Sequence, residues 1–186
     1  MAQKYYIMTL MRVFVAIDLP KDLKEKIFVI SQKISRNFSC KLVEKENLHL
    51  TLVFLGEKSE QEVEKIKKAV ADSTRSFGKI FLTIESLELF PLKRPRGIWF
   101  KVGGEEEKLK ELHKKIIDEL VKQKIPVEDL RFTPHICILR FKDGVRKQPE
   151  KIGLEENFIA EKITVFQSKL SPKGPTYFKL KEFGLE

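Results

Sequence analysis

Apolar residues along this chain recur with two different periods, and the two kinds of segment alternate. Runs of consecutive or alternating apolar residues predict β-strands, and apolar residues repeated every three or four positions predict helices. The predicted strands cover residues 12–19, 48–54, 80–90, 97–102, 132–139, 158–170 and 177–185. The predicted helices cover residues 20–36, 60–70 and 109–120. Because strands and helices are interleaved, this order predicts an α+β fold with largely antiparallel sheets.

Polar and turn-forming residues mark the ends of several segments. Ser59 followed by Glu62 is a capping box, which predicts the start of a helix. The Asp143-Gly144 pair predicts a polar loop, and the segment 172–175 predicts a turn between two strands. No linker or low-complexity segment divides the 186 residues, so we expect a single domain with its own core.

The balance of charge is basic. Lys and Arg number 36 against 27 Asp and Glu, which gives a formal charge of +9. A net positive charge raises the local concentration of polyanions, so nucleic acid is the obvious partner. Part of the excess is mixed with glutamate on helix faces, as in residues 62–68, and that pattern is typical of a solvated surface.

The sequence shows neither a membrane-spanning segment nor a signal peptide. No apolar run approaches the roughly 20 residues that span a bilayer, and residues 1–10 lack the apolar core and cleavage site of a signal peptide. Cys40 and Cys137 lie far apart in the sequence and do not have metal-ligand spacing. We therefore expect a cytoplasmic protein with reduced thiols and no membrane segment.

Two of the three histidines lie in matching contexts. His49 belongs to the sequence LHLTL and His135 to PHICI, and each segment alternates apolar with other residues. In a strand, this alternation points His49 and Thr51 to one face, about 7 Å apart. His135 and Cys137 would likewise share one face of their strand. Two such strands side by side would present two imidazoles across a cleft.

Facing imidazoles suit acid–base chemistry near neutral pH, because histidine titrates near ~6.5. Cleavage of a phosphodiester needs a base for the attacking water and an acid for the leaving oxygen. The Thr51 hydroxyl can donate a hydrogen bond to a non-bridging phosphate oxygen, where negative charge develops.

Other interpretations of these residues remain open at this point. A histidine in a strand is often purely structural, and a metal site would need a third ligand nearby. The remaining histidine, His113, lies among lysines beside an apolar helical stripe and is predicted to be on the surface. We therefore predict no metal. Cys137 is not favoured as a nucleophile, because small buried cysteines are usually inert.

Several sequence blocks, in order, resemble the 2H phosphoesterases, specifically the RNA 2′,3′-cyclic phosphodiesterases of bacteria and archaea, long called 2′-5′ RNA ligases. The blocks are residues 11–20, 47–56, 90–91, 131–140 and 168–177. The resemblance implies a bilobal fold with pseudo-two-fold symmetry, in which largely antiparallel sheets surround a central cleft and helices lie outside. It makes residues 12–185 a single domain of two lobes, and residues 1–11 an extension or an alternative start.

The resemblance also implies an activity. Water would open the 2′,3′-cyclic phosphate at an RNA end and leave a 2′-phosphate, without metal or cofactor. Separately from the resemblance, we expect the protein to be a monomer. His49 would be the general acid and His135 the general base. Phe54 would lie near the nucleobase. Three further side chains would contact phosphate oxygens, those of Thr51, Cys137 and Arg140.

Two features depart from that pattern. Cys137 stands where the family has threonine, and a thiol is the weaker hydrogen-bond donor. Plain alternation also points Phe54 and Arg140 away from the histidine face, so they would reach the cleft only if each strand ended or bulged first. The alternatives to hydrolysis are 2′-5′ joining of RNA ends, and RNA binding with weakened catalysis.

Overall fold

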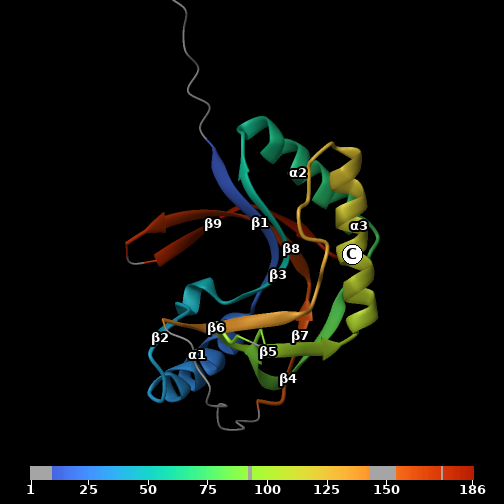
Figure 1. Ribbon diagram of the computed structural model, residues 1–186. Helices are drawn as coiled ribbons and strands as arrows, with labels where there is room; N and C mark the ends of the chain where they lie inside the picture. Colours follow the sequence, from blue (N-terminus) through green and yellow to red (C-terminus); the bar gives the residue numbers. More distant parts are fainter. Residues whose placement is uncertain (1–9, 92–93, 143–153, 173) are drawn as a thin grey trace, which may run out of the picture.

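The computed structural model describes residues 10–91, 94–142, 154–172 and 174–186. Over these ranges the chain forms two antiparallel sheets and three α-helices, which confirms the predicted α+β class. The helices lie on the outside of the two sheets (Figure 1). None of the helices in these ranges is long and apolar enough to cross a membrane.

The first sheet has four strands. Its order is β3 (His49–Lys58), β1 (Met11–Asp18), β8 (Lys162–Ser171) and β9 (Gly174–Gly184). Helices α2 (Glu60–Thr74) and α3 (Glu106–Lys122) pack against each other, and α2 contacts β3, β8 and β9. The buried stripes of both helices therefore face apolar residues of this lobe.

The second sheet has five strands. Its order is β2 (Cys40–Leu42), β6 (His135–Phe141), β5 (Gly97–Gly104), β4 (Ile80–Phe90) and β7 (Glu156–Ala160). Helix α1 (Lys21–Ser35) follows β1 of the first sheet directly but packs on β2 and β6 of the second. A short 3₁₀ turn, η1 (Lys45–Asn47), then returns the chain to the first sheet at β3.

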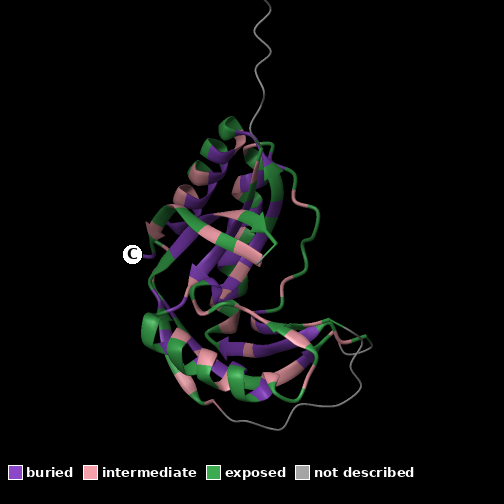
Figure 2. Ribbon diagram, turned by 90° about the vertical axis from the view of Figure 1, so that its left-hand side faces the viewer, coloured by how far each residue is buried: buried purple, intermediate pink, exposed green. Residues whose placement is uncertain are grey.

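The two lobes meet where β3 and β6, the two histidine strands, approach each other. Figure 2 shows the lobes one above the other, with buried residues running through both. One continuous apolar cluster includes Val15 and Leu50 from the first sheet and Phe100 and Ile136 from the second. This shared core holds the two motif strands at a fixed separation.

Most of the predicted segments are confirmed. The capping box forms as expected, because the Glu62 N–H donates to the Ser59 hydroxyl at 3.4 Å and the Glu62 carboxylate accepts from the Ser59 N–H at 2.8 Å. The predicted loop at Asp143-Gly144 lies outside the described residues.

The prediction of one strand over residues 158–170 is wrong. This segment contains β7 and β8, which belong to different sheets and are separated at Glu161. Apolar positions recur on both sides of Glu161, so periodicity alone does not reveal that the chain changes sheets there. Strand β2 was not predicted, because three residues are too few to show a period.

The prediction that His113 lies on the surface is also wrong. Its side chain is 7% exposed and stacks on the Phe132 ring, with 4.5 Å between ring centroids. Burial lowers the pKa of His113, so the imidazole is neutral at pH 7. Phe132 comes from the irregular segment before β6, and helix periodicity cannot show that a distant segment covers a helix flank.

Candidate active site

Strand β3 carries a β-bulge just after its histidine motif. Thr51 and Val53 lie opposite consecutive residues of β1, so Leu52 between them is the additional residue. Leu52 and Val53 are both buried, and the alternation of faces is therefore reset. As a result Phe54 lies on the same face as His49, contrary to the expectation from unbroken alternation.

Strand β6 carries a bulge at the corresponding place. Cys137 and Leu139 lie opposite consecutive residues of β5, which makes Ile138 the additional residue. Ile138 and Leu139 are both buried, and Arg140 then returns to the face of His135. Phe54 and Arg140 occupy equivalent positions, five residues after each histidine. The pseudo-symmetry of the lobes thus extends to the two bulges.

Both ring nitrogens of His49 are engaged. Nδ1 lies 2.6 Å from the Asn47 carbonyl oxygen and Nε2 lies 2.8 Å from the Thr51 hydroxyl. A carbonyl only accepts hydrogen bonds, so Nδ1 carries the proton of the neutral ring. The Thr51 hydroxyl then donates to Nε2. Nε2 is therefore the ring nitrogen that carries no proton.

The surroundings of His49 favour its neutral form. Burial lowers the pKa of His49 to about 4, against the opposing effect of the bond to the Asn47 carbonyl. The positive charges of Lys24 and His135 lower this pKa further, and the carboxylate of Asp18 raises it. Asp18 is itself held by an ion pair with Lys24 at 2.6 Å. In the ligand-free protein, His49 is neutral at pH 7.

His135 repeats this arrangement on β6. Its Nδ1 lies 2.7 Å from the Thr133 carbonyl oxygen, so this ring also carries its proton on Nδ1 and turns Nε2 outward. Burial lowers the pKa of His135, while the bond to Thr133 raises it. The ring packs on Trp99 with 3.9 Å between centroids, and Phe90 stacks on the Trp99 ring at 3.5 Å.

Cys137 does not reproduce the role that Thr51 has beside His49. Its Sγ lies 3.7 Å from the Leu139 carbonyl oxygen, to which the thiol donates. Burial raises the pKa of Cys137, and the nearby Arg140 lowers it in part. The thiol is therefore protonated at pH 7, which argues against a nucleophilic thiolate.

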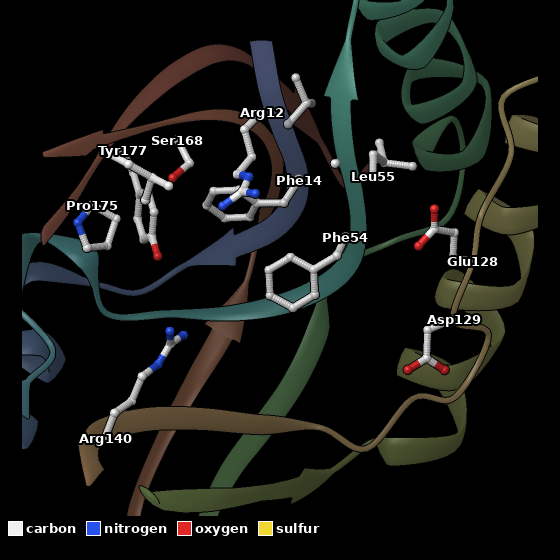
Figure 3. Close-up of a pocket in the computed structure, with 13 residues that line it drawn as sticks. Arg12, Phe14, Phe54, Leu55, Glu128, Asp129, Arg140, Ser168, Pro175 and Tyr177 are labelled. Carbon is white, nitrogen blue, oxygen red and sulfur yellow. The ribbon is translucent and has the colours of Figure 1, made fainter. Parts of the chain in front are cut away.

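A pocket of about 380 Å³ lies over the first sheet, beside the His49 ring: Phe14 and Tyr177 line the pocket and also contact that ring. Figure 3 shows the rings of Phe54 and Tyr177 between the guanidinium groups of Arg12 and Arg140. Phe14 contacts this group and the His49 ring, with 5.0 Å between the Phe14 and His49 centroids. The pocket is aromatic in its middle and positively charged at two ends. The opposite wall contains Glu128 and Asp129.

Several of these residues had no assigned role in the sequence analysis. Tyr177 packs edge-on against His49, with 5.3 Å between ring centroids, and burial raises its pKa. It belongs to the last of the matching blocks, but its contact with His49 depends on the sheet order β3-β1-β8-β9. Trp99 and Phe90 were missed for the same reason, since strand pairing decides which aromatic rings reach His135.

Potential metal ligands are spread over different parts of the fold. Within the described ranges, no group of three or more His, Cys, Asp or Glu side chains is arranged to hold a metal ion. His49 and His135 face the cleft from different sheets, and His113 is buried elsewhere on α3.

Comparison with known proteins agrees with this geometry. The model of the LigT-like phosphoesterase family matches residues 17–99. The RNA 2′,3′-cyclic phosphodiesterase of Thermotoga maritima is 33% identical over 182 residues, which cover 95% of this chain and 96% of that protein. The enzyme of the same name from Archaeoglobus fulgidus is also 33% identical, and the match covers 93% of this chain and 99% of the relative.

Solved structures are similar over nearly the whole chain. A Thermus thermophilus protein superposes with a TM-score of 0.82 and 28% identity, covering 94% of this chain and 98% of its own. Escherichia coli LigT complexed with 3′-AMP gives a TM-score of 0.80 and 25% identity, covering 95% and 99%. The resemblance stated from the sequence blocks is confirmed, and the chain belongs to the LigT-like phosphoesterase family.

Proposed function

We propose that this protein hydrolyses the 2′,3′-cyclic phosphate at an RNA end to a 2′-phosphate. The observation that carries the proposal is the matched state of His49 and His135. Each ring donates from Nδ1 to the backbone carbonyl two residues earlier, at 2.6 Å and 2.7 Å, which leaves Nε2 as the nitrogen without a proton in both rings. Two such nitrogens on facing strands suit a reaction that needs one acid and one base.

The proposed reaction is a single displacement at phosphorus. Nε2 of His135 accepts a proton from a water molecule, and the water oxygen forms a bond to phosphorus. The bond from phosphorus to the ribose 3′ oxygen breaks, and Nε2 of His49 donates a proton to that oxygen. The products are a free 3′ hydroxyl and a 2′-phosphate monoester, so one water is consumed for each cyclic phosphate opened.

The low pKa of His49 bears directly on its role as the acid. With a pKa of about 4, this ring carries no proton on Nε2 at neutral pH in the ligand-free protein. A bound phosphate anion beside Nε2 favours the charged imidazolium and raises its pKa. We therefore propose that the proton for the leaving oxygen is taken up together with the substrate.

The remaining site residues would bind the substrate. The Thr51 hydroxyl, the Cys137 thiol and the Arg140 guanidinium would contact phosphate oxygens, where negative charge increases in the transition state. A planar guanidinium can bind two oxygens at once. The exposed ring of Phe54 would stack on the terminal nucleobase.

A direct test uses an RNA that ends in a 2′,3′-cyclic phosphate, with analysis of the product end. A 2′-phosphate supports the proposal, and its loss in His49→Ala and His135→Ala variants that melt normally supports the roles of the two rings. A joined product would instead favour the ligase alternative. Binding without turnover would favour an RNA-binding protein.

We further propose that the protein works as a monomer in the cytoplasm, with residues 12–185 as its domain. The two thiols, Cys40 and Cys137, are free, which suits a reducing compartment. Strand β1 begins at Met11, so a chain that starts there keeps the pairing of Met11 with Lys58. Light scattering, cell fractionation and activity of the shortened chain test these three statements.

A further inference from the structure

Arg12 is a cation in the pocket for which the proposed reaction gives no role. It lies near the start of β1, on the same face as Phe14, and it is exposed. Its neighbours across the sheet are Glu57 on β3 and Ser168 on β8. Within the described part of the chain Arg12 forms no salt bridge, even with Glu57 directly opposite.

The position of Arg12 separates it from the reaction centre. Ala16 pairs with Thr51, and Arg12 comes four residues earlier on β1. At the usual rise of a strand, its backbone lies about 13 Å along β1 from the proposed phosphate site. Arg140 already provides a guanidinium at that site from the other sheet.

Aromatic side chains fill the space between the two arginines. Phe14 pairs with Phe54, with 6.0 Å between ring centroids, and Tyr177 packs edge-on against Phe14 at 4.8 Å. In the view of Figure 3 the Arg12 guanidinium overlaps the Phe14 ring at the height of Tyr177, Phe54 lies lower, and Arg140 lies lowest. The pocket therefore presents a cation, then an aromatic surface, then a second cation.

This order corresponds to the chemistry of one terminal nucleotide within an RNA chain. Its 2′,3′-cyclic phosphate lies at one end, its base and ribose lie in the middle, and its 5′-phosphate links it to the preceding nucleotide. A guanidinium that forms no ion pair with the described residues, as is the case for Arg12, is a strong hydrogen-bond donor to phosphate. The carboxylates on the pocket wall belong to the segment that connects α3 to β6, and Asp129 is paired with Arg131 at 2.8 Å.

We propose that Arg12 binds the 5′-phosphate of the terminal nucleotide, and that this contact makes the enzyme prefer RNA ends to free cyclic mononucleotides. The inference rests on the proposed hydrolase function and adds a second phosphate position to it. Arg12 acts here in substrate selection, since the reacting phosphorus lies at the other end of the pocket.

Three substrates distinguish a contact of Arg12 with the 5′-phosphate from contacts with other parts of the RNA end. The first is adenosine 2′,3′-cyclic phosphate, the second is the same nucleotide with a 5′-phosphate, and the third is a dinucleotide that ends in the cyclic phosphate. For the wild type, we expect kcat/KM to be about tenfold higher for the second and third substrates, the effect of one charged hydrogen bond. In Arg12→Ala that ratio should fall to near one, and Arg12→Lys should restore it in part.

Control variants make each result interpretable. Arg36→Ala removes the same charge from an exposed position at the end of α1 and should leave the ratio unchanged. An equal loss on all three substrates in Arg12→Ala would overturn the inference, as would no loss on any. A loss confined to the dinucleotide would also overturn it, because the contact would then be to the preceding nucleoside. If the wild type opens none of the three, the hydrolase proposal itself fails.

Discussion

Thr51 directs its hydroxyl to His49 at 2.8 Å, whereas Cys137, at the equivalent position of the other motif, directs its thiol to a backbone carbonyl at 3.7 Å. The two half-sites are thus matched in their histidines and in their bulges but differ in the donor beside Nε2. A thiol is a weaker donor than a hydroxyl and needs a longer contact. The difference identifies Cys137 as the position where a single substitution would make the halves alike.

A Cys137→Thr variant is expected to be at least as fast as the wild type. The new hydroxyl lies beside His135 and offers a stronger hydrogen bond to a phosphate oxygen. The Cys137→Ala variant should be only modestly slower, because Thr51 and Arg140 still bind the phosphate. Complete removal of an oxyanion donor costs ~10²–10³ in rate, and a thiol supplies only part of that.

Single-turnover rates of both variants provide the measurement, with thermal melting to show that the fold is kept. A loss beyond roughly tenfold in Cys137→Thr, about 1.4 kcal/mol of barrier, would contradict the donor role. It would instead favour a reaction that requires the thiol itself. Alkylation of the wild type does not separate these cases, because an adduct in the cleft blocks the substrate in either case.

The folded protein should become less stable as the pH falls from about 6.5 to 4. His49 has a pKa of about 4 in the folded protein, and near ~6.5 in an unfolded chain. The unfolded state therefore binds more protons in this window. The contribution of His49 to the free energy of unfolding is complete above the pKa of the unfolded state, and roughly 3 kcal/mol of it is lost as the pH falls to the pKa of the folded state. Urea unfolding at pH 7 and pH 4 should show the loss, and His49→Gln should remove much of it.

Bound phosphate should reverse the pKa shift of His49. An anion beside Nε2 stabilises the imidazolium, so inorganic phosphate should raise the pKa of this ring and cause proton uptake near neutral pH. NMR titration of the His49 ring with and without phosphate measures the change, and the buried His113 serves as an internal control. A ligand-free pKa near 6.5 that does not respond to phosphate would contradict the proposed coupling.

The rate should show a bell-shaped dependence on pH, since one imidazole must be charged and the other neutral. Because burial lowers the pKa of both His49 and His135 in the ligand-free protein, the acidic limb of kcat/KM should lie below the value for a free histidine. The limb of kcat, measured with bound substrate, should lie at higher pH. A flat profile of single-turnover rates between about pH 5 and 9 would not be compatible with two titrating rings.

Arg140→Ala should weaken RNA binding and slow the reaction by roughly a hundredfold, because it removes a cation from the reacting phosphate. Arg140→Lys should recover only part of this, since a point charge lacks the planar fork. The slope of log affinity against log salt should also decrease by about 0.7 for the lost phosphate contact. Arg36→Ala again serves as the control, and an equal effect in both variants would indicate a general charge effect.

The sequence was sufficient to predict the fold class, the helices and the facing of His49 with Thr51, because each depends on local periodicity. It did not predict that Phe54 and Arg140 share the histidine face. That result depends on bulges at Leu52 and Ile138, which form when a strand pairs with its neighbour and leave no distinct composition behind.

Sheet order limited the prediction of the site in a similar way. Tyr177 reaches His49 because β9 lies two strands from β1 through β8, and no single-segment pattern contains that information. The burial of His113 by Phe132 was missed because the covering residue comes from a segment without regular structure. Long-range pairing, more than local conformation, accounts for these errors.

Trp99 supports the His135 ring from the neighbouring strand. The two rings lie 3.9 Å apart between centroids, and Phe90 stacks on Trp99 from β4. The indole N–H has no hydrogen-bond partner among the described residues, and the contact of Trp99 with His135 is the packing of their rings. Trp99→Phe should therefore keep most of the activity, whereas Trp99→Leu should lower kcat by roughly tenfold, because a loosely held base costs rate without losing substrate contacts.

A matched variant separates this effect from simple loss of stability. Phe100 follows Trp99 on β5, points to the opposite face of the sheet and is 1% exposed. Phe100→Leu should destabilise the fold through loss of buried volume, as Trp99→Leu does, but should leave His135 in place. We expect similar decreases in melting temperature for the two leucine variants and a decrease in kcat only for Trp99→Leu. If kcat fell equally in both variants, a general loss of rigidity in the second sheet would explain the decrease. Trp99 would then have no specific role in orienting the base.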